Sequence, residues 1–70
     1  MATRLGFIGF GIMGERLLRA ALNHDKDVIV VSGVFDPSPE TAGKLASIDE
    51  GLTAFASAED VIAASDCLHI

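Results

Sequence analysis

The sequence has one cysteine, no tryptophan or tyrosine, and few basic residues, and each shortage excludes a class of protein. The single cysteine, Cys67, rules out an internal disulfide and fits a reducing compartment. Only 5 lysines and arginines stand against 10 aspartates and glutamates, so nucleic acid and anionic membranes are not the expected partners. No apolar run approaches the roughly 18 residues that a membrane span needs. We therefore expect a cytoplasmic protein.

What remains is a mainly aliphatic chain. Of the 70 residues, 50% are hydrophobic and 6% are aromatic, which suits a compact α/β core and one domain at most. No cluster has the spacing of metal ligands, and no nucleophile–base pair or paired carboxylates can be recognised. The sequence thus predicts no metal site, and the catalytic residues are unknown.

The strongest motif is a glycine turn between an apolar run and an amphipathic segment. Residues 5–14 read Leu-Gly-Phe-Ile-Gly-Phe-Gly-Ile-Met-Gly, the GxGxxG pattern of a dinucleotide site. Gly9 allows a sharp turn, Gly11 lets a pyrophosphate approach the backbone, and Gly14 lets the helix pack closely. Free N–H groups at the helix start form an anion site without a basic side chain. The alternative is a glycine turn that serves packing alone.

Strands and helices alternate along the rest of the chain. We expect strands at 5–8, 28–35, 52–56 and 67–70, and helices at 12–23, 39–47 and 58–64. This βαβαβαβ order predicts an α/β fold with a parallel sheet of the Rossmann type. Because the last strand needs a covered edge, we expect residues 1–70 to be the N-terminal part of a dinucleotide-binding domain, truncated after the fourth strand. The rest of that domain and a substrate domain would lie outside this chain.

Local signals predict the details of these elements. Ser38 is the expected N-cap of the second helix, and Ser57 that of the third, with Asp60 completing a capping box. Gly33 marks a place where a side chain would collide with a neighbouring element. The buried stripe of the first helix is expected to consist of Met13, Leu17, Ala20 and Ala21.

Asp36 directly follows the second predicted strand and lies 22 residues after Gly14. This is close to the roughly 20 residues at which dinucleotide domains carry an acid that binds the ribose. Its carboxylate can accept hydrogen bonds from the ribose hydroxyls and would repel a 2′-phosphate, so it favours NAD over NADP. The alternative is a turn residue, since Asp-Pro often starts a turn. Ser38 and the cation Lys44 follow, so NADP stays open as the cofactor.

The other polar or reactive side chains have plainer interpretations. His24 is expected on the surface, and Arg16 and Arg19 on a solvated helix face. His69 is expected to pack between sheet and helix, and Cys67 to be a small buried residue.

Three segments resemble the Gfo/Idh/MocA family of glucose-fructose oxidoreductase and inositol dehydrogenase-like enzymes: residues 6–14, 27–37 and 53–62. The resemblance implies an NAD(P)-dependent oxidoreductase that transfers a hydride between the nicotinamide and a sugar, cyclitol or related polyol. The family's catalytic lysine would lie beyond Ile70 and is not carried over. The residues that the motif and the resemblance assign to the cofactor are Gly9, Phe10, Gly11, Ile12, Met13, Gly14 and Asp36.

Other interpretations lead to other substrates or to no catalysis. The same start resembles the 3-hydroxyisobutyrate and 6-phosphogluconate dehydrogenases, although their second strand ends sooner, often in Asn-Arg. Pyrroline-carboxylate reductase has a similar Gly-Phe-Ile-Gly start. A non-catalytic NAD-binding regulatory module is the alternative from a different class. In every case we expect a dinucleotide to bind. If the protein is an enzyme, we also expect a small-molecule substrate, and we expect the full-length protein to form a homo-oligomer.

Overall fold

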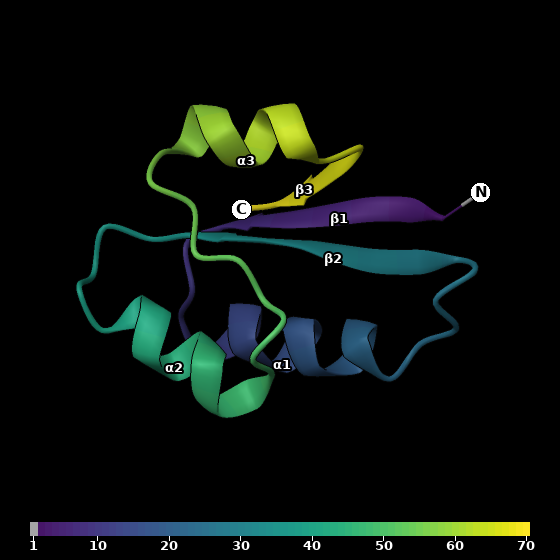
Figure 1. The fold of residues 1–70 in the computed structure, drawn as a ribbon, viewed down its shortest axis with the longest axis horizontal. Coiled ribbons are helices and arrows are strands. Elements are labelled where there is room, and N and C mark those ends of the chain that lie inside the picture. The colour runs from purple at the N-terminus through teal and green to yellow at the C-terminus, as the bar shows by residue number, and fades with distance from the viewer. Residues whose placement is uncertain (1) are drawn as a thin grey trace.

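A parallel sheet with helices on both faces forms the structure, a computed structural model that describes residues 2–70 (Figure 1). Its elements are β1 (Thr3–Ile8), α1 (Ile12–Leu22), β2 (Ile29–Phe35), α2 (Thr41–Ile48), α3 (Ala58–Ala64) and β3 (Cys67–His69). The strand order is β2-β1-β3, so the first strand lies in the centre. This arrangement confirms the predicted α/β fold of the Rossmann type.

The two faces of the sheet carry different helices. α1 and α2 cover one face, and α3 covers the other (Figure 1). On the first face, Phe7 of β1 and Val34 of β2 are fully buried against Leu18 of α1 and Leu45 of α2. On the second face, a Cβ at Gly6 would lie 2.7 Å from the side chain of Val61 in α3. The glycine therefore lets α3 lie directly on β1.

The predicted strand at 52–56 is reduced to a single parallel bridge between Ala54 and Val34. The backbone of this segment exchanges hydrogen bonds of 2.8 and 2.9 Å with Val34, so it lies along the outer side of β2, where a Rossmann domain has its third strand. Gly33 permits this approach, because its φ is +148° and a Cβ would lie 2.6 Å from the ring of Phe55. The predicted collision at Gly33 is confirmed, whereas the full strand is not formed.

α1 buries a different stripe from the predicted one. Met13 is 69% exposed and Leu17 is 39% exposed, and Ala20 is also exposed. The buried residues of α1 are Gly14, Leu18 and Ala21. A Cβ on Gly14 would lie 3.3 Å from the carbonyl oxygen of Gly9, so the glycine turn sets the close side of the helix and the next turns follow at i+4 and i+7. The predicted stripe was therefore wrong, apart from Ala21.

The two later helices test the predicted caps. The Oγ of Ser57 accepts a hydrogen bond of 3.1 Å from the amide of Asp60, so the cap of α3 is confirmed. Ser38 does not cap α2, whose N-cap is Glu40 without a side-chain hydrogen bond. Asp36 accepts from the amide of Ser38 in an Asx turn, and this turn delays the helix by two residues beyond the predicted start.

An ion pair between Arg4 and Asp66 joins β1 to the start of β3 at the amino-terminal side of the sheet. Asp66, just before β3, accepts hydrogen bonds from the Arg4 amide (2.8 Å) and from its Nε (3.2 Å) and Nη2 (3.0 Å). The Asp66 amide in turn donates to the Arg4 carbonyl at 2.8 Å. The guanidinium, followed by the Arg4 amide, lowers the pKa of the Asp66 carboxyl. The pair holds β3 in register beside β1.

Within residues 2–70, no helix has both the length and the apolar character that crossing a bilayer requires.

Candidate functional site

The carboxyl ends of all three strands meet at one edge of the sheet (Figure 1). The glycine turn follows β1 at this edge, the loop with Asp36 follows β2, and β3 ends there beside β1. β2 pairs with one side of β1, and β3 pairs with its other side. The direction in which strands are added to the sheet therefore reverses between β1 and β3. In open α/β sheets, ligands bind outside the carboxyl ends of the strands at such a switch point.

The glycine turn leaves backbone amides without partners at the start of α1. Gly9 has a φ of +90°, a conformation that L side chains rarely adopt, and this turn directs the chain into the helix. Gly11 is the N-cap, no side chain caps it, and the first bond within the helix runs from the Glu15 amide to the Gly11 carbonyl at 2.9 Å. The amides that precede this bond and have no acceptor within the helix are those of the N-cap Gly11 and of Ile12, Met13 and Gly14.

The space beside these amides is open. A Cβ placed on Gly11 would meet nothing within 4 Å, and the side chains of Ile12 and Met13 are 81% and 69% exposed. An anionic group can therefore reach the amides without displacing protein atoms, and the positive end of the helix dipole favours it. The start of α1 thus fits a pyrophosphate.

Asp36 lies against the same turn, although the sequence places it 26 residues from Phe10. One carboxylate oxygen accepts the Phe10 amide at 2.6 Å, and the other accepts the Ser38 amide at 2.8 Å. These bonds, the one from Ser38 first, lower the pKa of the carboxyl, so Asp36 is ionised at neutral pH. A carboxylate can accept about four hydrogen bonds, so the two from the backbone leave capacity for ribose hydroxyls.

Phe10 contributes less to an open site than its position in the motif suggests. Its ring is 6% exposed and belongs to the core with Phe7 and Leu18. Its amide is bonded to Asp36, so it is not available to a pyrophosphate in this structure. The role of Phe10 here is to join the glycine turn to the end of β2. No local pattern in the sequence indicates this bond, because it depends on how closely the two loops approach.

Three further side chains were singled out from the sequence. His24 is exposed, as predicted. Cys67 is also exposed, so the prediction of a buried residue was wrong; it lies on β3, which is an edge strand of this three-stranded sheet. His69 is half-buried, and its ring lies 5.7 Å from that of Phe7, tilted by 57°. The predicted packing of His69 is therefore only partial.

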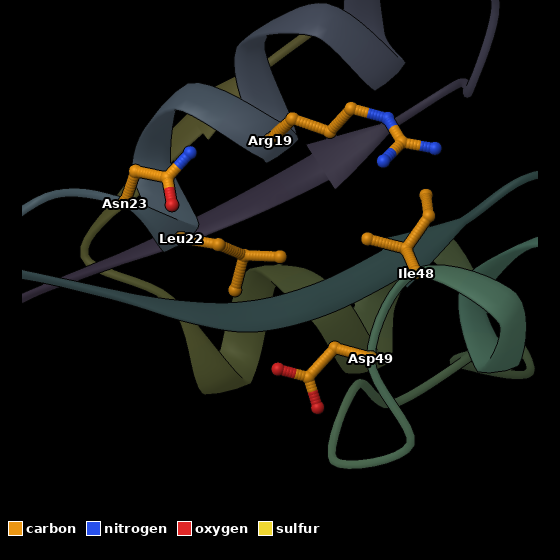
Figure 2. A pocket seen from close by; sticks show the side chains of 5 residues that line it. All are labelled: Arg19, Leu22, Asn23, Ile48 and Asp49. Atoms are coloured by element: carbon orange, nitrogen blue, oxygen red, sulfur yellow. The ribbon is translucent and has the colours of Figure 1, made fainter.

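A shallow hollow of about 350 Å³ lies away from this edge, between the C-terminal ends of α1 and α2 (Figure 2). Arg19 and Leu22 of α1 and its C-cap Asn23 line one side, and Ile48 of α2 and its C-cap Asp49 line the other. Arg19, the lining residue nearest to the glycine turn along α1, lies two turns beyond Gly11, about 12 Å at the ordinary helical rise. The hollow is thus not part of the site at the carboxyl edge. Among residues 2–70, no group of three or more metal-ligating side chains is assembled.

The fold, the unpartnered amides and the ionised acid at the switch point are those of a Rossmann-type dinucleotide-binding domain. Residues 4–69 match the model of a family described as NADP oxidoreductase, coenzyme F420-dependent, and the chain belongs to this family. Neither a curated protein nor a solved structure matches the chain. The family makes this chain a Rossmann domain of an NAD(P)-dependent oxidoreductase, and it confirms the resemblance to the sugar dehydrogenase-like enzymes only at that level.

Proposed function

We propose that this domain binds NAD(H) in preference to NADP(H), for hydride transfer to or from a small substrate. The observation that carries the preference is the ionised carboxylate of Asp36, which is hydrogen-bonded to the glycine turn. A 2′-phosphate on the adenosine ribose would bring a second negative charge to this carboxylate, whereas the free 2′-hydroxyl of NAD would donate a hydrogen bond to it.

Each part of the edge has a distinct task in this proposal. The amides of Ile12, Met13 and Gly14 bind the pyrophosphate, and Gly11 provides the room for it. Asp36 orients the adenosine ribose at the end of β2. When bound, the nicotinamide supplies or accepts the hydride; the protein contributes binding and orientation. None of these residues is assigned an acid or base role.

A second candidate follows from the family description, which names NADP and coenzyme F420. In that case the domain would bind NADP(H) and exchange a hydride with coenzyme F420. Lys44, close enough to Asp36 to contribute to its lowered pKa, is the cation that could attract a 2′-phosphate. Asp36 opposes this candidate, because its carboxylate is hydrogen-bonded to the glycine turn and would repel a 2′-phosphate, whereas Lys44 is the smallest of the causes that lower its pKa.

The substrate class rests on the resemblance of residues 6–14, 27–37 and 53–62 to the Gfo/Idh/MocA enzymes. We propose a sugar, cyclitol or related polyol on that basis. A 3-hydroxyisobutyrate-type hydroxyacid is the competing class, and a regulatory module that binds the cofactor without turnover is the non-enzymatic alternative. A homo-oligomer remains a prediction for the full-length protein.

The test is a titration of the full-length protein with NADH and with NADPH, for the wild type and for Asp36→Ala. We expect the wild type to bind NADH about tenfold or more tightly than NADPH, since one unpaired or repelled charged group costs on the order of 1.5–3 kcal/mol. The Asp36→Ala variant should lose this preference. Asp66→Ala, which removes a second exposed carboxylate with a lowered pKa, is the matched control and should keep it.

Each contrary result has a clear meaning. Tighter binding of NADPH by the wild type would select the NADP candidate, and reduction of coenzyme F420 would then be the next assay. Binding of neither cofactor would show that the glycine turn serves packing, and the proposal would fail.

A further inference from the structure

Two consecutive amides of the glycine turn are bound by the end of β2 and the residue that follows it. The Gly9 amide donates to the Phe35 carbonyl at 2.8 Å, and the Phe10 amide donates to the carboxylate of Asp36 at 2.6 Å. The second bond joins residues that lie 26 positions apart in the sequence. The turn is thus attached to the neighbouring strand through one backbone oxygen and one ionised side chain.

Phe10 stands between two glycines that have no close neighbours. A Cβ on Gly9 or on Gly11 would meet nothing within 4 Å, so packing does not hold either residue in place. Glycine also loses more conformational freedom than any other residue when its backbone is fixed. The ring of Phe10 is 6% exposed and lies in the core, which fixes the position of this residue. The orientation of the peptide plane before it then depends on what the N–H and C=O groups of that plane contact.

The bond to Asp36 sets the orientation of this plane, which joins Gly9 to Phe10. The peptide bond is trans, so its N–H and C=O groups point in opposite directions. The N–H points at Asp36, and the Gly9 carbonyl oxygen lies near the start of α1, where a Cβ on Gly14 would be 3.3 Å from it. Turning the plane over would bring the carbonyl oxygen to the carboxylate, and the two negative groups would repel each other. Asp36 therefore stabilises the orientation that the turn has in this structure.

We propose that Asp36, through the Phe10 amide, holds the glycine turn in the conformation that binds the pyrophosphate, so that the ribose and pyrophosphate subsites are energetically coupled. The inference rests on the proposed function and adds a second task for Asp36. Toward the pyrophosphate, Asp36 is a positioning residue: it does not touch this group but fixes the turn that does. A turn that is held before the cofactor arrives loses less conformational entropy on binding.

The charge of Asp36 by itself would have the opposite effect on a pyrophosphate. A carboxylate beside the turn repels an anion, so its removal should strengthen pyrophosphate binding if charge were its only influence. If the carboxylate holds the turn, its removal should weaken binding even though the repulsion is gone. Inorganic pyrophosphate has no ribose, so its affinity reports on the turn without any contact between Asp36 and the ribose.

The first test is a titration of the full-length protein with inorganic pyrophosphate, followed through the amide resonances of Ile12, Met13 and Gly14. We expect Asp36→Ala to weaken binding about fivefold, and to move the Phe10 amide proton upfield because its acceptor is lost. Asp66→Ala also removes a carboxylate bonded to a backbone amide and is the matched control. It should leave the affinity within about twofold. Equal or tighter pyrophosphate binding by Asp36→Ala would overturn the proposal.

A second variant removes the donor and keeps the carboxylate. Phenyllactate, the α-hydroxy analogue of phenylalanine, replaces Phe10 during translation, so an ester oxygen stands where the N–H was, while the ring and Asp36 remain. We expect NADH binding to weaken about fivefold or more. The same analogue at Phe55, whose amide donates to the Val34 carbonyl at 2.8 Å, also costs one backbone hydrogen bond and is the matched control. It should leave NADH affinity within about twofold.

The contrary outcomes separate this inference from the proposed function. Unchanged NADH affinity with the ester at Phe10, or equal losses with the ester at Phe10 and at Phe55, would overturn the coupling. Wild-type protein that binds neither NADH nor pyrophosphate would instead contradict the proposed function itself.

Discussion

The two ends of the sheet each carry an aspartate with a lowered pKa, and the two differ in what lowers it. At the amino-terminal end, the Arg4 guanidinium binds both oxygens of Asp66 and neutralises its charge. At the carboxyl end, Asp36 is held first by the amides of Ser38 and Phe10, and Lys44 contributes less than either. Asp66 is therefore committed to holding two strands together, whereas Asp36 keeps its charge and part of its acceptor capacity. A lowered pKa alone does not distinguish a ligand site from a structural clip; the identity of the partner does.

The largest effects are expected from substitutions of two glycines, one of which should change NADH binding and the other the stability of the fold. Gly11 has an ordinary φ of −83° and open space around it, so Gly11→Val should barely change stability but should block the pyrophosphate. We expect a loss of about 100-fold in NADH affinity, equivalent to about 3 kcal/mol. Gly33→Ala should do the reverse, because its φ of +148° and the nearby Phe55 ring leave no room for a methyl group. Its cost in unfolding free energy should be at least about 1–3 kcal/mol.

Urea unfolding and NADH titration on both variants check this separation. If Gly11→Val bound NADH normally while remaining folded, the pyrophosphate could not lie at the glycine turn.

Acidification should lower the free energy of unfolding, by less than the glycine substitutions change binding or stability. The pKa of each aspartate is lower in the folded state than in the unfolded chain, so the unfolded state binds more protons in this range and stability rises with pH. Both contributions should be complete above about pH 5 and should be lost as the pH falls below about 4. Asp36→Asn and Asp66→Asn should each make the unfolding free energy less dependent on pH in this window, and only Asp36→Asn should also weaken NADH binding. Equal effects of both variants on NADH affinity would remove the contrast between the two ends.

The smallest effect on stability is expected from the ion pair between Arg4 and Asp66, which we call the amino-terminal clip. Arg4→Ala removes an exposed ion pair, so the melting temperature should fall by no more than about a few degrees, and less at high salt. Binding of NADH should not change, because the clip lies at the opposite end of the strands. Melting curves at about 0.05 and 1 M salt, together with one NADH titration, provide the measurement. A change in NADH affinity would show that the clip also sets the geometry of the carboxyl edge.

The sequence predicts the elements of this fold better than the faces that they bury. The apolar runs of β1 and β2 and the Ser57 cap of α3 are local signals, and each lies where expected. The stripe of α1 was misassigned because Gly14, which faces the sheet, adds nothing to an apolar periodicity, while the exposed Met13 does. The segment around Ala54 has the composition of a strand, but its pairing depends on how the chain passes Gly33.

The parts of the candidate site that follow a sequence motif could be predicted, whereas the contact between two loops could not. The glycines of the turn and the position of Asp36 can be read directly from the chain. The bond between Asp36 and the Phe10 amide joins segments far apart in the sequence, so no periodicity announces it.

The central place of β1 has a consequence for how this domain is made. β1 leaves the ribosome before β2 and β3, and the partner on its second side, which follows Asp66, comes 62 residues after Arg4. Until that segment emerges, a strand containing Leu5 and Phe7 presents an unpaired edge to other nascent chains, the kind of edge that promotes aggregation. Slowing translation before β3 has emerged from the ribosome should therefore lower the yield of folded protein, whereas the same pause placed after β3 has emerged should not.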